Sequence, residues 1–110
     1  MKLQHRFSDL QLESIIEEAT IYFCACPAQV AAQIRQLRHL IRDQNDCETK
    51  DDSNSIVHQT IAQAGLQAHQ ILEDCMDNIL ELEGWDRTTL KMPEGLRQRR
   101  DALLDQEDSD

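Results

Sequence analysis

The chain has 110 residues, of which 40% are hydrophobic, and its 21 acidic and 11 basic residues give a formal net charge of -10. This charge argues against nucleic-acid binding through a basic face, because such binding needs Lys and Arg to neutralise phosphates. The length indicates a single small domain, and a composition with only three glycines and two prolines favours helix.

The first residues, MKLQHRFSDLQLE, lack the apolar stretch of a secretion signal, and no apolar run reaches the roughly 18 residues of a membrane-spanning helix. We therefore expect a cytoplasmic protein that does not enter a membrane. Its four cysteines are then expected to be reduced thiols, because disulfides are rare in the cytoplasm.

A first helix is predicted to begin near Ser8 and Asp9, residue types that commonly cap helix N-termini, with Phe7 packing over its entry. Its apolar residues recur at helical spacing and form one stripe: Leu12, Ile15, Ile16, Ala19 and Phe23. The helix is expected to end within 24–26, because Pro27 disfavours helical geometry in the residue before it.

The second predicted helix begins at Pro27, which suits a first helical turn. Its stripe has a four-three-four spacing: Val30, Ile34, Leu37 and Ile41. Three arginines fall largely off this stripe, where cations late in a helix complement its dipole: Arg35, Arg38 and Arg42. We predict that the helix ends near 43–45 and that residues 45–54, which include Cys47, form an exposed, mobile connection.

The longest predicted helix spans residues 55–84, which contain five acids and no base. Eight residues at alternating four- and three-residue spacing form its predicted core stripe: Val57, Ile61, Ala64, Ala68, Ile71, Cys75, Asn78 and Leu82. Gly65 lies beside two alanines of this stripe, so it either admits another helix closely or breaks this one. Gly84 is expected to end the helix, and Trp85 to cover the end of the bundle.

Together these elements predict an all-α fold: an antiparallel three-helix bundle with a long third helix and a short C-terminal helical segment that opens near Pro93. The bundle domain is expected to span 1–85. Residues 86–110 would form a C-terminal segment with a short helix and a disordered acidic tail.

By residue count, positions 77–84 of the third helix overhang the turn between the first two helices. Their apolar residues need cover from either the C-terminal segment or a second subunit. We favour a homodimer through the long third helix, in which Asn78 fixes register and faces its counterpart.

The same count brings Cys24, Cys26 and Cys75 to one end of the bundle. Thiolates are favoured ligands of zinc and other soft metals, so these residues form a candidate metal site, with His69 as the nearest fourth ligand. The two cysteines near the turn could instead be a redox pair. The simplest interpretation is that all three thiols only pack as small hydrophobes.

His69 and Glu73 share one helical face, but the paired Glu-x-x-His motifs of helical di-metal proteins are absent. Four further potential ligands are expected near the opposite end of the bundle, where surface histidines are the simpler interpretation: His5, His39, Cys47 and His58. The sequence contains no nucleotide-binding glycine loop and no nucleophile elbow.

We therefore predict a small non-catalytic helical interaction or regulatory protein, without a cofactor, that forms a homodimer and contacts a protein partner. The alternative is a metal-binding or redox-sensing protein that uses the three cysteines.

Overall fold

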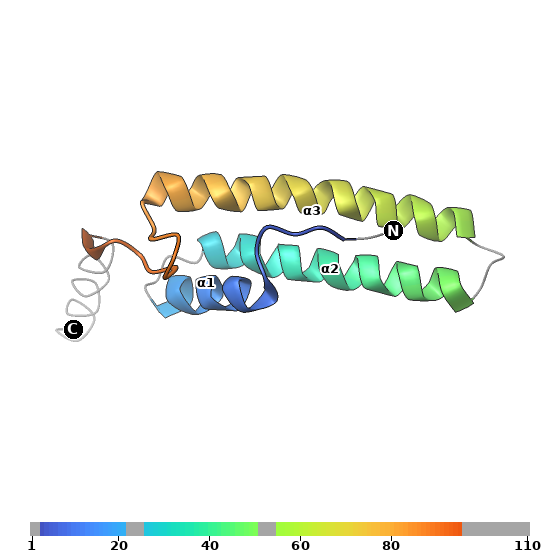
Figure 1. The fold of residues 1–110 in the computed structure, drawn as a ribbon, viewed down its shortest axis with the longest axis horizontal. Coiled ribbons are helices and arrows are strands. Elements are labelled where there is room, and N and C mark those ends of the chain that lie inside the picture. The colour runs from blue at the N-terminus through green and yellow to red at the C-terminus, as the bar shows by residue number, and fades with distance from the viewer. Residues whose placement is uncertain (1–2, 22–25, 51–54, 96–110) are drawn as a thin grey trace, which may run out of the picture.

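The structure is a computed structural model that describes residues 3–21, 26–50 and 55–95. The helices of this part of the chain are α1 (Asp9–Ile21), α2 (Cys26–Lys50) and α3 (Ser55–Glu83). Consecutive helices run antiparallel, and α2 contacts both α1 and α3 (Figure 1). The predicted all-α bundle with a long third helix is confirmed.

α1 begins with a capping box, in which two residues at a helix start satisfy each other's backbone N–H groups. The Ser8 N–H donates to the Gln11 side-chain oxygen at 2.8 Å, and the Gln11 N–H donates to the Ser8 hydroxyl at 3.1 Å. Phe7, just before the cap, is buried. The predicted start of this helix is therefore confirmed, whereas Phe23 lies outside the described residues.

The hydrophobic core draws on all three helices and on the segments beside them. Its fully buried helical side chains are Leu12, Ile15, Ala19, Ala31, Ile34, Met76 and Leu80. Ile16 and Val30 pack against this cluster as partly buried residues. The stripes predicted for the first two helices therefore face the core, where each large side chain contributes about 1.5–3 kcal/mol relative to exposure.

α2 is longer than the sequence analysis predicted. It continues to Lys50 rather than ending at 43–45, so Cys47 is an exposed helical residue and not part of a loop. The chain has no glycine or proline between positions 28 and 50, and long polar side chains such as Gln and Lys have good helix propensity.

α3 is continuous through Gly65. A Cβ atom placed on this glycine would lie 3.0 Å from Cγ1 of Ile41, which is itself buried. Of the two outcomes predicted for Gly65, close approach of another helix is therefore the one observed, and the approaching helix is α2.

The core stripe predicted for α3 is wrong. The helix buries a neighbouring face instead: Ala62, Gly65, His69, Glu73, Met76 and Leu80. Most of the predicted stripe faces outward, and Val57, Ile71 and Leu82 are 54, 67 and 86% exposed. The buried face contains a histidine and a glutamate, so the spacing of apolar residues alone does not predict it.

Gly84 follows the last residue of α3 with a φ of +74°, the conformation that glycine adopts most readily at a helix end. Three residues beyond it then join the core: Trp85, Leu90 and Met92. The segment after α3 thus folds back over the end of the bundle, and Leu80 is fully buried. Two covers were predicted for the overhang, the C-terminal segment or a second subunit. The C-terminal segment covers Leu80, while Leu82 on the outer face of α3 stays exposed.

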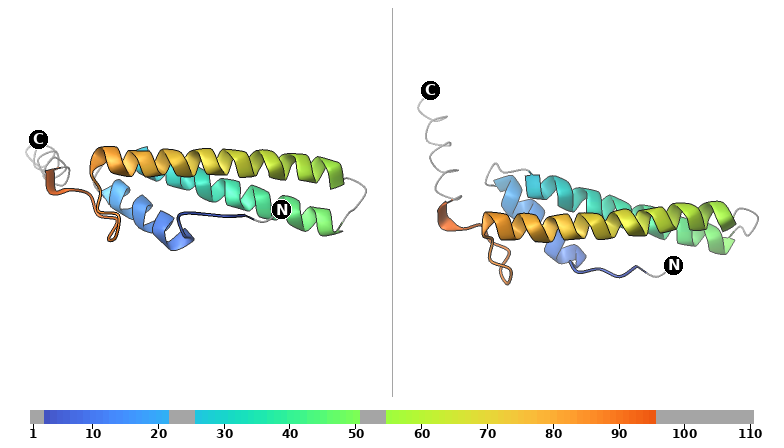
Figure 2. Two further views of the ribbon diagram at one scale, coloured as in Figure 1. Left: turned by 45° about the horizontal axis from the view of Figure 1, so that its top comes forward. Right: turned by 90° about the horizontal axis from the view of Figure 1, so that it is seen from above.

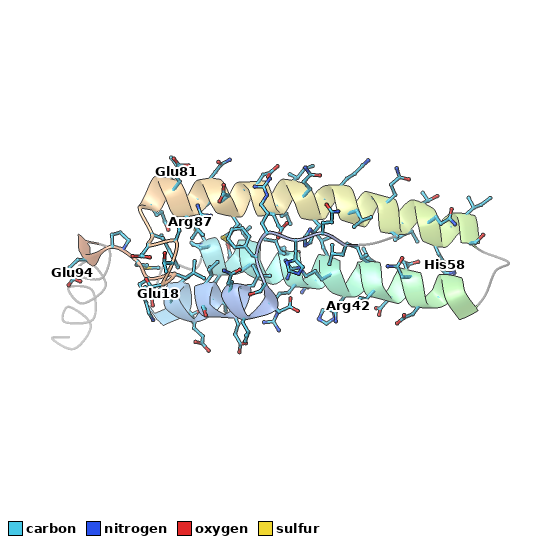
Figure 3. All side chains as sticks on the ribbon, in the orientation of Figure 1. Glu18, Arg42, His58, Glu81, Arg87 and Glu94 are labelled. Carbon is cyan, nitrogen blue, oxygen red and sulfur yellow. The ribbon has the colours of Figure 1, made fainter. Side chains whose placement is uncertain are left out.

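A buried carboxylate on α1 fastens this segment. Glu18 accepts a hydrogen bond from the Met92 N–H at 3.0 Å and one from the Lys91 ammonium at 3.4 Å. Figure 3 places Glu18 and Arg87 at this end of the bundle and His58 at the opposite end.

The helix predicted to open at Pro93 would lie mainly in 96–110, outside the described residues. Among the residues that the structure does describe, no helix is both long enough and apolar enough to cross a membrane.

Candidate functional site

Three charged or polar side chains meet in the interior between α2 and α3. The side chains of Arg38 on α2 and of His69 and Glu73 on α3 are each 4% exposed or less. Burying an ionised group is unfavourable unless it is paired and hydrogen-bonded. The partners of these three groups therefore decide what the cluster does.

Glu73 binds the backbone of the segment before α1. Its Oε2 atom accepts hydrogen bonds from the N–H groups of Arg6 at 2.9 Å and Phe7 at 3.1 Å. The same oxygen lies 3.2 Å from Nη2 of Arg38. One carboxylate oxygen on α3 thus joins α2 and the N-terminal segment.

Arg38 uses its guanidinium in four directions. Besides the contact with Glu73, its Nη2 donates to the Phe7 carbonyl at 2.6 Å and its Nη1 donates to the Asp9 carboxylate at 2.7 Å. The hydrogen bond from Arg38 lowers the pKa of Asp9 below its usual value. Its Nε donates to Nε2 of His69 at 3.0 Å. The expectation that Arg38 lies largely off the core stripe is therefore wrong, because its side chain is only 3% exposed and reaches the exposed Asp9 carboxylate from the interior.

The contact with Arg38 determines the protonation of His69. An arginine Nε–H can only donate, so Nε2 of His69 must accept, and the proton of the neutral ring lies on Nδ1. That atom is 3.7 Å from Oε1 of Glu73. Burial lowers the pKa of His69 below 6.5, and Arg38 acts in the same direction while Glu73 opposes it.

An open pocket lies beside the cluster, between the N-terminal segment and α3. It is lined by Gln4, His5, Arg6, Leu66, His69, Gln70 and Glu73. The lone pair of His69 is already used by Arg38, so the ring is not free to take a proton from a molecule in this pocket. The geometry therefore supports a positioning role, in which the cluster holds the N-terminal segment against α2 and α3.

The predicted cysteine site is only partly described. Cys26 is exposed at the start of α2, Cys75 is half-buried on α3, and Cys24 lies outside the described residues. His69, the predicted fourth ligand, is occupied by Arg38. Within the described ranges, no three His, Cys, Asp or Glu side chains are grouped closely enough to hold a metal ion.

The potential ligands predicted at the opposite end are also dispersed. His58 Nδ1 lies 2.8 Å from the Gln44 side-chain oxygen. His5 lines the pocket beside Glu73, whereas His39 and Cys47 are exposed on α2.

No protein-family model, curated protein or solved structure matches the chain.

The Arg38–Glu73 pair is not among the predicted sites, although the sequence contains two signals of it. One was the spacing of His69 and Glu73, four residues apart on one face of the third helix. The other was the position of Arg38, four residues after Ile34 and three before Ile41, because residues at these spacings lie on the same side of a helix. Ile34 and Ile41 are both buried, so Arg38 shares the side of α2 that faces the core.

Removing the charge of Glu73 tests the buried ion pair. Glu73→Gln keeps an oxygen that can accept backbone N–H groups but leaves Arg38 without its buried counter-charge. We expect the free energy of unfolding to fall by about 3 kcal/mol. Glu17→Gln makes the same change at an exposed site of α1 and should alter it by less than about 0.5 kcal/mol. Equal losses in urea unfolding would show that the pair contributes no more than a surface charge.

The lowered pKa of His69 predicts a pH dependence. At pH values between this pKa and 6.5, the unfolded chain binds more protons than the folded one. The contribution of His69 to the free energy of unfolding is therefore complete above pH 6.5 and declines as the pH falls below it. The charged groups acting on the ring are Glu73, Arg38 and His5. The free energy of unfolding, measured with urea from pH 7.5 to 5.5, should fall less with pH for His69→Gln than for the wild type. The exposed His39→Gln control should show the pH dependence of the wild type. The same pH dependence for all three proteins would contradict the assignment.

Proposed function

We propose that the protein is a small non-catalytic helical interaction or regulatory protein that acts as a homodimer through α3. The observation that supports this proposal most directly is the outward face of that helix. We name the eight residues of its repeating pattern the outer seam: Val57, Ile61, Ala64, Ala68, Ile71, Cys75, Asn78 and Leu82.

The outer seam has the spacing of a helix–helix contact, and five of its eight residues are exposed in the described part of the chain. Its residues alternate at four and three positions, as in coiled coils, whose seam inserts into a facing helix. Val57, Ile71 and Leu82 are well exposed, whereas Ile61, Ala68 and Cys75 are half-buried. Exposed large apolar side chains repeated along one face of a helix, here Val57, Ile71 and Leu82, are typical of an interaction site.

The exposed face of α2 differs in character. It is mainly polar: Gln29, Gln33, Arg35, Gln36, His39, Arg42, Asp43 and Asp46. One large apolar side chain, that of Leu40, is exposed among the described residues of α2, at 38%. The two long helices therefore differ in what they present to solvent, and α3 is the one suited to binding another helix.

The proposed location and the proposed partner are supported by the cysteines and by the apolar face of α3. We propose a cytoplasmic location, supported by the free thiols of Cys26, Cys47 and Cys75. A protein partner is also proposed, because an apolar helical face suits a helix better than it suits nucleic acid or a charged lipid surface. No cofactor is invoked.

Self-association can be tested by placing a charge on the outer seam. Ile71→Glu should shift the protein from dimer to monomer in sedimentation velocity at micromolar concentration. Leu10→Glu is a matched control, because Leu10 is similarly exposed but lies on α1. Both side chains are exposed in the single chain, so the melting temperature of the monomer should change little. A wild-type protein that remains monomeric at these concentrations would refute the homodimer.

The alternative proposal is a metal-binding or redox-sensing protein that uses Cys24, Cys26 and Cys75. It is supported by the arrangement of the helices, because α2 begins at the end of the bundle where α3 finishes (Figure 1). Cys26 and Cys75 therefore belong to the same half of the molecule.

Metal analysis and thiol titration of freshly purified protein separate the two proposals. Metal-binding predicts zinc or iron near one ion per chain, lost in Cys75→Ser and retained in Cys47→Ser. Under the leading proposal, the protein holds no metal, the exposed thiols of Cys26 and Cys47 react quickly, and half-buried Cys75 reacts more slowly.

A further inference from the structure

We infer that two copies of the chain pair antiparallel along the outer seam, with the two-fold axis between Ala68 and Ile71. This inference rests on the proposed homodimer and specifies its geometry. Its occupant is a second copy of α3, not an unidentified helix.

The length of the seam sets the register. It runs from Val57 to Leu82, and a symmetric contact pairs residue i with residue j and residue j with residue i. Complete antiparallel overlap therefore places Val57 against the partner's Leu82 and Ala64 against the partner's Cys75. The centre of the overlap pairs Ala68 with the partner's Ile71.

The charges of α3 favour this direction. All five acids of the helix lie within 73–83, and residues 55–72 contain no Asp, Glu, Lys or Arg. A parallel pair would set the two acidic halves side by side, where like charges repel. An antiparallel pair sets each acidic half against the partner's uncharged half.

Ion pairs within the chain offset three of these five acids: Arg38 pairs with Glu73, Arg6 with Asp74 and Arg87 with Asp77. The repulsion in a parallel pair would therefore come mainly from the last turn of each helix. Glu81 is exposed one position before Leu82 of the seam. In the antiparallel register Glu81 lies level with the start of the partner's α3, which contains no acid, whereas a parallel register places it beside a second acidic helix end.

Side-chain volumes point the same way. The antiparallel register pairs a small residue with a large one at the centre, Ala68 with the partner's Ile71. A parallel register would stack alanine on alanine at one level and isoleucine on isoleucine at the next. Closely packed interfaces require the first kind of complementarity.

Asn78 is the seam residue that favours a parallel pair, because two asparagines could then bond to each other. In the antiparallel register it meets the partner's Ile61, one level from the end of the seam. Asn78 is exposed in the single chain, so its amide can retain water at that margin.

The shape of the molecule is compatible with this arrangement. Figure 2 shows α2 and α3 continuing past α1 as a two-helix arm, while α1 and residues 84–93 lie at the other end of the bundle. An antiparallel pair sets the broad end of one copy beside the narrow arm of the other. A parallel pair would bring the two broad ends together.

Disulfide mapping tests the direction. The variant combines Ala64→Cys with Cys24→Ser, Cys26→Ser and Cys47→Ser, so that thiols remain only at positions 64 and 75. Mild oxidation is done at a concentration where sedimentation shows a dimer. Cleavage after Glu73 separates the two positions, and mass spectrometry identifies the linked peptides.

A disulfide between position 64 of one copy and Cys75 of the other supports the antiparallel register. Links from 64 to 64 and from 75 to 75 overturn it while preserving the homodimer. A dimer that forms no disulfide at all also overturns it, because the seam thiols would then not be adjacent. A monomeric wild-type protein refutes the proposed function and this inference together.

A charge reversal gives an independent measurement on protein with its native cysteines. Glu81→Lys should leave the dimer dissociation constant within about twofold in the antiparallel register, where position 81 faces an uncharged segment. A tightening of about fivefold or more would indicate that two acidic ends had been relieved, and would overturn the inference.

Discussion

The buried ion pair between Arg38 and Glu73 is the contact on which the rest of the structure depends. Two ionised groups can remain in the interior only if their geometry is good and their other hydrogen-bonding atoms are satisfied. Glu73 meets this condition with two backbone N–H groups, and Arg38 meets it with a carbonyl, a carboxylate and His69. The pair therefore determines how α2 and α3 are rotated about their axes and where the segment before α1 must lie.

This rotation explains the unusual surface of α3. The helix has two rows with heptad-like spacing, and the row that contains His69 and Glu73 faces α2. The other row, although more apolar, is left outside. Gly65 favours the same face of α3, because the absence of a side chain there allows Ile41 of α2 to lie directly against the backbone of α3. An apolar surface suited to a second helix is thus a consequence of polar chemistry in the interior.

The helices, their antiparallel order and the N-cap at Ser8 could be predicted from the sequence, because each depends on local spacing and on residues close in the chain. The core face of α3 could not, because hydrophobicity ranks Ile71 above His69 and only the three-dimensional partner Arg38 reverses that order. The end of α2 was misplaced for a similar reason. Its last residues are polar, and polarity alone does not distinguish an exposed helix from a loop. Chain length alone allows two covers over Leu80, since it does not reveal that Glu18 holds the backbone of Met92.

The two carboxylates that hold the ends of the chain have a consequence for folding. Glu73 binds backbone atoms 66 and 67 residues earlier in the chain, and Glu18 binds the Met92 N–H 74 residues later. Contacts between residues so far apart require closure of a long loop, whereas helix turns and the α2–α3 hairpin form from near neighbours. We therefore expect the helices to assemble first and the N-terminal segment and residues 84–93 to attach afterwards. The hydrogen bonds of both attachments are made to backbone N–H groups, and the buried side chains of Phe7 and Met92 add packing against the core at the same two points.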